Sequence, residues 1–433
     1  MKSLVFLRIA IVGILIIFGL IIFHAPFTVW LGTLMPDQAL LIKAWKEILM
    51  LVISTCLILF VALQKDTKRF FNDKLIYIPL IYILLHLIMT VVLGGNKQQT
   101  IAGLMIDLRY IVFFILAYIT VQYFPLIRRY ILVTFSGASV ASIIFALLQI
   151  FILPKNFLAI IGYSKDTIEP YLTVDRNHDF IRINGTLRGP NPLGAFTMMW
   201  AIFTCVFAAM HRRFTHQKWW IFLLLYISFA AILWASYSRS AAIGLVAALL
   251  SAIIFWHGLR LPRSFWIISG VVATSILFIF LLARENHFLQ TVVFHNDPKE
   301  GNVANSDEGH ITSLRDGSIK MLQQPFGAGV GSTGSASYFS DQPVVIENQY
   351  LLIAHEVGWI GLLVFFIIIG IIFKRLMPFR KKDWLAMSVL ASGVGLLLIG
   401  MLLPVFVDDT VSMVWWGLAG LALGSKIDKN KKS

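Results

Sequence analysis

Apolar runs of about 20 residues recur along almost the whole chain, and they constrain the fold more than any other feature. Inside a bilayer every backbone polar group needs an internal partner, so runs of this length predict membrane-spanning helices. The composition agrees, since 58% of the 433 residues are hydrophobic and 13% are charged. We expect an all-α, polytopic membrane protein that forms a single transmembrane domain over residues 1–433. Twelve spans are predicted, at about 4–23, 39–63, 75–93, 101–123, 131–153, 190–210, 219–237, 240–256, 265–283, 349–373, 384–404 and 405–424.

The first run follows Lys2 and Arg8, a pattern that secretory signal peptides share. The next residues, IIFHAPFTVW, contain no small-residue cleavage pattern, and further spans follow. We therefore expect a retained first helix.

Lysine and arginine mark every second connection between the predicted spans. These connections hold most of the 36 basic residues and few of the 22 acidic ones, so the positive-inside rule places them and both termini in the cytoplasm. The net charge of +14 then reflects topology and does not indicate nucleic-acid binding. The basic segments are the N-terminus, 64–74, Arg128 with Arg129, 211–218, 257–263, 374–382 and the C-terminal tail.

The same topology places three connections outside: residues 154–189, the SYSRS corner at 236–240, and one large loop at 284–348. ATP and sugar nucleotides are absent from that side, so chemistry there requires a substrate already delivered across the membrane. Cys56 and Cys205 lie within predicted spans, and we expect both to be small core residues and not a disulfide.

Arginine is unusually placed on the predicted outer side. The sequence GTLRGPNPLGAF, residues 185–196, sets Arg188 among glycines and prolines. Arg239 lies at a minimal turn on the side where the positive-inside rule disfavours cations. An ionisable group within a span indicates a functional residue, and the fourth span contains one. The further arginines of interest are Arg182, Arg315 and, within that fourth span and two residues after Asp107, Arg109.

Guanidinium groups stay charged and bind phosphate through paired hydrogen bonds, so we expect a diphosphate ligand at the outer leaflet. Asn191 and Pro192 begin the sixth span, whose amino end also favours an anion. Two alternatives stay open: arginines that extend to lipid phosphates, and a purely structural re-entrant turn around Arg188.

Four segments of the chain carry a family resemblance. They are, in order, RINGTLRGPNPLGAF (182–196), SRS (238–240), HITSLRDGSIKMLQQPFGAGVGSTG (310–334) and ENQYLLIAHEVGWIG (347–361). In this order they resemble the O-antigen ligase and polymerase superfamily, the bacterial lipid-linked glycan ligases and polymerases. The resemblance covers the C-terminal two-thirds of the chain. We place the ligase/polymerase-like region at residues 190–424, including the external loop 284–348.

The resemblance implies a GT-C-like fold and an inverting, metal-independent glycosyltransferase without a cofactor. It further implies a bacterial plasma membrane location, an undecaprenyl diphosphate-linked glycan as donor, and a glycan or lipid-linked acceptor. Arginines in the matching positions are expected to hold the diphosphate leaving group. Together with the charge argument, the substrate-binding candidates are Arg182, Arg188, Asn191, Arg239, Arg315, Asn348 and Arg109.

The presumed base departs from the family pattern. Ligases of this family have a His, then Asn, Ser or Gln, nine residues and GxxG; Asn348, Gly358 and Gly361 fit this frame, but Glu347 replaces the His. A carboxylate can also deprotonate a sugar hydroxyl, so Glu347 is the first catalytic candidate. The replacement also fits the polymerase branch, and a Glu at a helix start also fits a simple partner of the helix dipole.

Two histidines are possible substitutes for the missing family His. His310 precedes Arg315 by five residues in the outer loop and is the second catalytic candidate. His355 follows Asn348 by seven residues, about 10 Å deeper along the helix, so we expect it to be buried in a packing role.

Three other patterns indicate structure and not chemistry. GVGSTG (329–334) matches a dinucleotide motif but lacks a strand-helix-strand unit, so a flexible turn is expected. Asp408 and Asp409 lack further ligands for a metal and are expected to form a solvated cap. Interface belts are expected for Trp219, Trp220, Trp415 and Trp416.

Two other classes of protein stay open. A flippase or transporter for lipid-linked glycans also needs many spans and cations, but its charges line a path to both leaflets. A membrane scaffold does not account for Arg109, Arg239 and Glu347 together.

Overall fold

The computed structural model describes residues 2–68, 72–174, 177–258 and 306–425. Most of these residues are helical, which confirms the all-α prediction, and the strands form one antiparallel hairpin of β1 (Leu172–Val174) and β2 (Asn177–Arg182). The helices are α1 (Lys2–Leu20), α2 (His24–Leu34), α3 (Ala39–Lys43), α4 (Trp45–Leu63), α6 (Lys74–Leu93), α7 (Lys97–Tyr123), α8 (Ile127–Phe151), α9 (Pro190–Met210), α10 (Arg212–Gln217), α11 (Trp219–Ser236), α12 (Arg239–His257), α14 (Ser306–Gln323), α15 (Gln349–Leu376), α16 (Trp384–Gly400) and α17 (Asp409–Gly424).

Nine helical segments in the described residues are long and apolar enough to cross a membrane. The first is longer than the predicted span 4–23, because α1 continues through a 3-10 turn at Ile21–Phe23 into α2 and ends at Leu34. The last two predicted spans become the shorter helices α16, with 17 residues, and α17, with 16. The predicted span 265–283 lies outside the described residues. The count of twelve and the GT-C-like arrangement therefore stay predictions.

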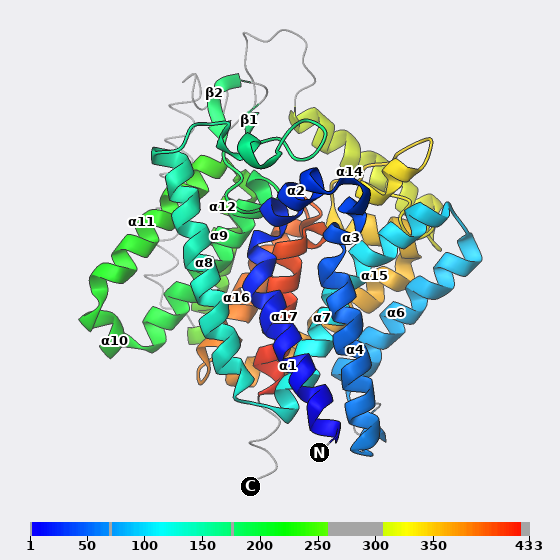
Figure 1. The fold of residues 1–433 in the computed structure, drawn as a ribbon, viewed down its shortest axis with the longest axis horizontal. Coiled ribbons are helices and arrows are strands. Elements are labelled where there is room, and N and C mark those ends of the chain that lie inside the picture. The colour runs from blue at the N-terminus through cyan, green and yellow to red at the C-terminus, as the bar shows by residue number, and fades with distance from the viewer. Residues whose placement is uncertain (1, 69–71, 175–176, 259–305, 426–433) are drawn as a thin grey trace.

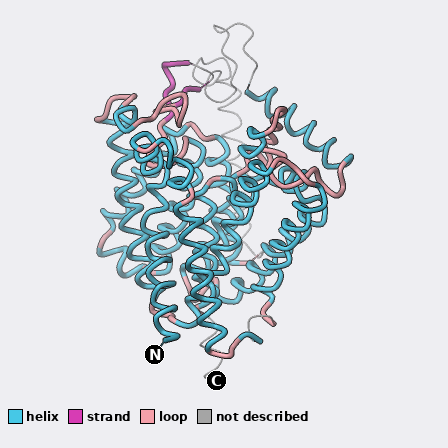
Figure 2. The backbone as a smooth tube through the Cα atoms, turned by 45° about the vertical axis from the view of Figure 1, so that its right-hand side comes forward, coloured by secondary structure: helices cyan, strands magenta, loops and turns pink. Residues whose placement is uncertain are grey.

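The predicted outer loop 284–348 is described only from residue 306, and residues 284–305 lie outside the described part. Its described part contains α14 and a 3-10 turn at Gly334–Phe339. Figure 2 shows α14 and the two strands at one end of a bundle whose long helices run in roughly the same direction.

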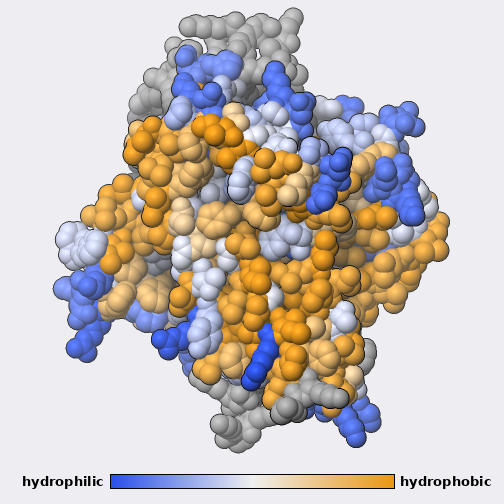
Figure 3. All heavy atoms as spheres, viewed as in Figure 1, coloured by the Kyte–Doolittle hydropathy of each residue, from blue (hydrophilic) through white to orange (hydrophobic). Residues whose placement is uncertain are grey.

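The surface suits a lipid environment. Figure 3 shows hydrophobic residues over a broad middle band, with hydrophilic residues mainly above and below it. Large apolar side chains such as Leu51, Val91 and Ile227 are more than half exposed, an arrangement that lipid contact favours and water does not.

The two ends of the bundle differ in character. The amino end of α1 and the carboxyl end of α17 lie at the lower end of Figure 1, together with the basic helix α10. Side-chain bonds tie this end together, since Arg128 binds Asp383 at 2.8 Å and Ser425 at 3.0 Å. The hairpin and α14 lie at the opposite end. The basic connections that the structure describes thus share one end, as the sequence predicts, while the assignment of that end to the cytoplasm stays a prediction.

The centre of the bundle is the contact of α7 with α17. A Cβ atom on Gly420 would lie 2.6 Å from the Phe114 carbonyl oxygen, so glycine permits the close approach of the two helices. Trp415 and Trp416 are fully buried here, and the Trp415 indole donates to the Val389 carbonyl at 3.1 Å. The predicted interface position is therefore wrong for this pair, because α7 and α16 cover α17. Trp219 and Trp220 are more than half exposed, which agrees with the predicted interface position for these two residues.

The cysteines are placed as predicted. Cys56 of α4 is buried, Cys205 of α9 is half-buried, and both are free thiols.

Candidate functional site

The turn that carries Arg188 is buried except for that one side chain. Residues 183–190 are buried apart from Arg188, which is exposed. The Gly185 amide donates to Gln149 Oε1 at 2.8 Å, and the Thr186 hydroxyl bonds Ser142 at 2.6 Å. Gly185 has φ of +58°, and a Cβ there would meet the Leu193 side chain at 2.8 Å. The turn is thus held rigidly against α8 and α9, and it presents a single cation.

Arg182 ties this turn to the next helical corner. At the end of β2, its Nε donates to the Ser236 carbonyl at 2.9 Å, and its Nη2 donates to Asn191 Oδ1 at 2.6 Å. Asn191 lies in the first turn of α9, directly after Pro190. The structure therefore joins Arg182 and Asn191, two predicted site residues, through a direct bond.

Arg239 is the first residue of α12, at the corner that Arg182 contacts. Ser238 is the N-cap of this helix, and its hydroxyl accepts from the Ala241 amide. A Cβ on Gly194 of α9 would lie 2.7 Å from the Ser238 Cβ, so the two helices touch at this level. Tyr237 has φ of +47° at the corner, and burial raises the pKa of its phenol. The half-buried Arg239, at the start of α12, thus lies beside the first turns of α9.

The predicted base lies where α14 packs on α15. The Glu347 amide donates to the Ser313 hydroxyl of α14 at 2.9 Å, and the Glu347 side chain is half-buried. Position 310 lies on α14 one turn before Ser313, while the His310 side chain lies outside the described part. Arg315 is exposed on the same helix and is 3.7 Å from Asp316.

Asn348 is the N-cap of α15. Its Oδ1 accepts from the Tyr350 and Leu351 amides at 2.9 and 3.0 Å, and its Nδ2 donates to the Met401 carbonyl at 2.7 Å. These bonds satisfy orphan amides of the first helical turn and fix the entry of α15 against the end of α16. A substrate-binding role for Asn348 stays a prediction.

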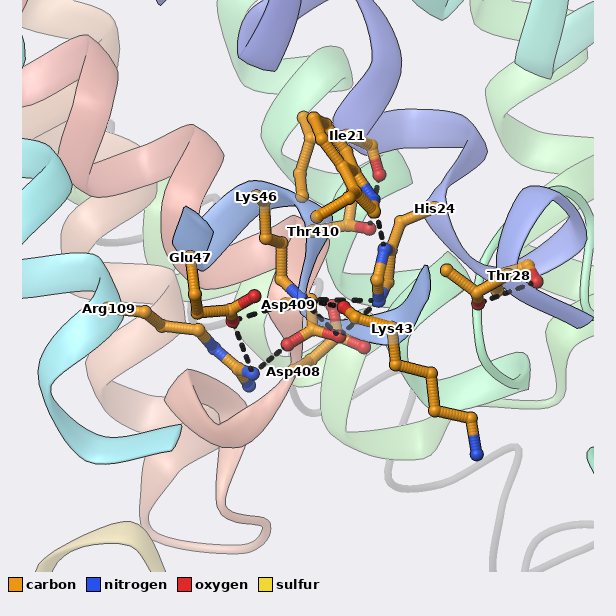
Figure 4. Close-up of polar contacts among 12 residues, drawn as sticks. Ile21, His24, Thr28, Lys43, Lys46, Glu47, Arg109, Asp408, Asp409 and Thr410 are labelled. Atoms are coloured by element: carbon orange, nitrogen blue, oxygen red, sulfur yellow. Dashed lines mark hydrogen bonds and ion pairs between the residues drawn. The ribbon is translucent and has the colours of Figure 1, made fainter. Parts of the chain in front are cut away.

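Arg109 lies inside a buried network of charged groups (Figure 4). Its guanidinium is paired with the Asp409 carboxylate and the Val407 carbonyl, and Glu47 Oε1 is 3.9 Å away. Asp409 Oδ2 also lies 2.9 Å from His24 Nε2 and 3.7 Å from Lys46 Nζ. The network joins the start of α17 to α7, to the start of α4 and to the break between α1 and α2.

This network corrects the expectation for the aspartate pair. Asp408 does cap α17, since its Oδ1 accepts from the Val411 amide at 2.9 Å. Asp409 is not solvated, because its side chain is 13% exposed and lies among Arg109, Lys46 and His24. In the sequence the only nearby charge is Asp107, two residues before Arg109, whereas the partner Asp409 lies 300 positions further along the chain.

Segment 325–334 after α14 packs on α15, and most residues of its GVGSTG part are buried, so this part is not the predicted flexible turn. Helix α15 is kinked at Val357 and Gly358, where Gly358 has φ of +71°. The segment supplies the missing partners: the Ala328 amide donates to the His355 carbonyl at 2.6 Å, and the Trp359 amide donates to the Pro325 carbonyl at 2.9 Å. Gly358 of the predicted family frame thus forms a helix break sealed by this segment, whereas Gly361 lies in the regular helix that follows.

A pair of buried carboxyl groups, which the sequence reasoning missed, lies directly before the kink. Glu356 of α15 is 3% exposed and lies against Asp107 of α7, which is 7% exposed. Glu356 Oε1 accepts from the Thr333 amide at 3.4 Å. The sequence did contain a signal for this pair, because Glu356 is an ionisable residue within the predicted span 349–373. His355 itself is buried, as predicted.

The described residues therefore form two groups at this end of the bundle. Arg182, Asn191 and the Arg239 corner meet around the rigid turn of Arg188. Arg188 is also close enough to Asp408 for their charges to interact. Glu347 is bonded to Ser313 of α14, next to the Asn348 cap of α15, and the exposed Arg315 follows Ser313 by two residues. Arg109 is held apart by its own network. An exposed guanidinium group can bind a phosphorylated ligand, and a half-buried carboxylate can accept a proton.

Comparison with known proteins gives one family. Residues 222–366, about a third of the chain, match the family model described as O-antigen ligase. The matched residues run from α11 into α15 and include Arg239, Arg315, Glu347 and Asn348. This match supports the resemblance to the O-antigen ligase and polymerase superfamily. No curated protein matches the chain.

Proposed function

Since residues 222–366 carry an O-antigen ligase region, we propose that this membrane protein is a glycosyltransferase that moves a glycan from an undecaprenyl diphosphate carrier to an acceptor. The transfer takes place on the outer face of a bacterial plasma membrane, the end that holds the hairpin and α14. Both termini then lie in the cytoplasm. The reaction inverts the anomeric carbon and uses no metal ion.

The observation that carries this proposal is the exposed Arg188 on its buried turn. A cation held on a rigid backbone needs little reorganisation when charge develops on a leaving diphosphate. Arg182 and Asn191 brace the same turn, and Arg239 starts at the adjoining corner. These residues are proposed to hold the diphosphate as the glycosidic bond breaks.

Glu347 is the proposed general base. The acceptor hydroxyl must lose its proton as it attacks, from the side opposite the diphosphate. Glu347 is half-buried at the entry of α15, and its backbone is fixed by Ser313 and by the Asn348 cap. His310, one turn before Ser313 on α14, is the second candidate for this role.

The distribution of buried charge favours an enzyme over a transporter. Five charged side chains in the described residues are buried: Lys46, Asp107, Arg109, Glu356 and Asp383. Lys46 lies at the start of α4, Glu356 in the first third of α15, and Asp107 and Arg109 near the middle of α7, while Asp383 is bound to Arg128 at the opposite surface. A path for charged lipid heads through the membrane requires such groups over the remaining half of the bundle as well.

Reconstitution of the full chain in vesicles with a lipid-linked glycan and candidate acceptors tests the proposal. We expect transfer in the presence of excess chelator, and a fall in turnover of about 100-fold for Glu347→Gln, in the range that loss of a general base produces. Glu169→Gln is the matched control, because Glu169 is an exposed carboxylate in the other outer loop. Product length separates a single ligation from growth of a repeat polymer.

Three outcomes would contradict parts of this scheme. Loss of turnover on chelation would exclude a metal-free reaction. Near wild-type turnover by Glu347→Gln would transfer the role of base to His310. Transport of the lipid-linked glycan without any transfer product would replace the enzyme with a flippase.

A further inference from the structure

An apolar cavity of about 240 Å³ opens between α8, α9 and α11, away from the proposed transfer site. Its walls are aromatic: Phe135 of α8 stacks on Trp200 of α9 with ring centroids 5.2 Å apart. Phe207 meets Trp384 edge to face at 5.3 Å. The lining residues are Leu132, Phe135, Ser136, Trp200, Phe203, Thr204, Phe207, Phe222, Leu225, Trp384 and Leu418.

The cavity lies along the half of α8 that has no side-chain hydrogen bond to the turn before α9. Ser142 and Gln149 in the second half of α8 bind the turn at residues 185–186. The cavity begins at Ser136 and extends toward the start of α8. Helix α11 covers one side of it, and much of α11 is itself exposed toward the lipid.

A second, wider cavity of about 570 Å³ continues the first one to the basic end of the bundle. The two share Leu132, Ser136 and Trp384, so they form one groove. The wide part adds the start of α8 to the lining: Pro125, Leu126, Arg128, Arg129 and Val133. The groove therefore has an aromatic inner part and a cationic mouth.

One charge at this mouth is balanced and the other is exposed. Arg128 is bound by Asp383 and Ser425. Arg129 is exposed, and it lies on the helix face of Val133 and Ser136, four and seven residues later. Seven residues of helix span about 10 Å, so Arg129 lies about 10 Å along α8 from the Ser136 entrance to the aromatic part.

We propose that this groove binds an anionic phospholipid, with its phosphate at Arg129 and one acyl chain passing Ser136 into the aromatic cavity between α9 and α11. The groove matches the lipid along its length: the charged mouth faces the phosphate head group, and the apolar inner walls face the acyl chain. Basic pockets between membrane helices at the positive end bind anionic head groups, and the described basic connections gather at that end. The site is independent of glycan transfer.

Native mass spectrometry of the full chain in detergent, titrated with lipids, tests the assignment. We expect phosphatidylglycerol to bind about fivefold or more tightly than phosphatidylcholine with the same acyl chains, from one cation at the membrane surface. Arg129→Gln removes this preference. Arg375→Gln, an exposed arginine at the same end outside the groove, keeps it.

A second variant tests the acyl cavity. Ser136→Phe fills the junction of the two cavities and weakens both lipids by about the same factor, while Ile144→Phe, at an exposed position higher on α8, leaves binding unchanged. Thermal unfolding in lipid-free detergent verifies that each variant is folded; Leu225→Trp replaces Ser136→Phe if that chain does not fold. Equal binding of both phospholipids, or unchanged binding by Arg129→Gln, would overturn the proposal. Tighter binding of undecaprenyl phosphate than of phosphatidylglycerol would also overturn it, in favour of the carrier lipid.

Discussion

Arg109 and Arg188 are both close enough to Asp408 for their charges to interact with it, yet their surroundings are opposite. Arg109 is 7% exposed, and its guanidinium is held by Asp409 and the Val407 carbonyl. Arg188 is exposed, whereas the backbone that carries it is buried. One arginine is rigid through its side chain, and the other through its backbone.

The difference separates two uses of the same residue. A buried guanidinium with a carboxylate partner holds helices in place, because removal of either partner leaves an unpaired charge. An exposed guanidinium on a fixed turn keeps its donors for a ligand. The structure thus favours Arg188 over Arg109 as the contact to a diphosphate, although sequence reasoning treated both as substrate ligands.

The largest expected effect comes from breaking the Arg109 network. Asp409→Leu leaves Arg109 and Lys46 with Glu47 as their remaining carboxylate, and we expect a loss of about 3–5 kcal/mol in unfolding free energy. Arg109→Leu combined with Asp409→Leu should recover much of this loss, because it removes the pair together. Unfolding of the purified chains in detergent measures both, with Asp341→Leu as the exposed control.

If Asp409→Leu unfolds at the same temperature as wild type, the network does not hold the helices. The contrast between the two arginines would then rest on exposure alone.

Arg188→Ala is expected to act on turnover and leave stability almost unchanged. Loss of one preorganised donor to a developing charge lowers turnover by about 100-fold, while surface substitutions change stability by about 0.5 kcal/mol or less. Arg188→Lys should restore turnover only in part, because the planar fork is lost. The reconstituted transfer assay and a melting curve are read together, with Arg375→Ala as control. A melting temperature that falls in parallel with turnover would make Arg188 a structural residue.

The smallest expected effect concerns the tautomer of His24. The Trp45 indole donates to His24 Nδ1 at 3.0 Å, so the ring proton lies on Nε2 and points to Asp409 Oδ2. Trp45→Phe removes that donor, and we expect a loss of about 1 kcal/mol in unfolding free energy. Trp30→Phe, at an exposed position, is the control. Equal stability of the two variants would show that Trp45 does not orient His24.

Hydropathy predicts where the helices lie, since burial in lipid depends on local composition. The predicted spans 190–210 and 349–373 correspond closely to Pro190–Met210 and Gln349–Leu376. Local sequence also identifies Asn348 as the start of a helix. These features depend on neighbours within a few turns, which a single sequence contains.

Partners distant in sequence could not be predicted. Asp409 resembles a solvated cap in the sequence PVFVDDT, and only the packing of α17 on α7 places it beside Arg109. The same holds for Glu356, whose neighbour Asp107 comes from α7. The hairpin β1–β2 was missed because its strands have three and six residues and pair only with each other.

The Arg109 network has a consequence for the order in which the protein is made. The Arg109 guanidinium and its acceptor on Val407 are 298 positions apart, so the ribosome inserts α7 long before the partner exists. At roughly 5–20 residues per second this interval lasts about 15–60 s. During that time Arg109 and Lys46 lie in the nascent bundle with Glu47 as the carboxylate of the network already made. Any chain released before residue 409 keeps an excess of buried positive charge in this network. A truncated chain therefore differs from a full-length one by an unpaired buried cation.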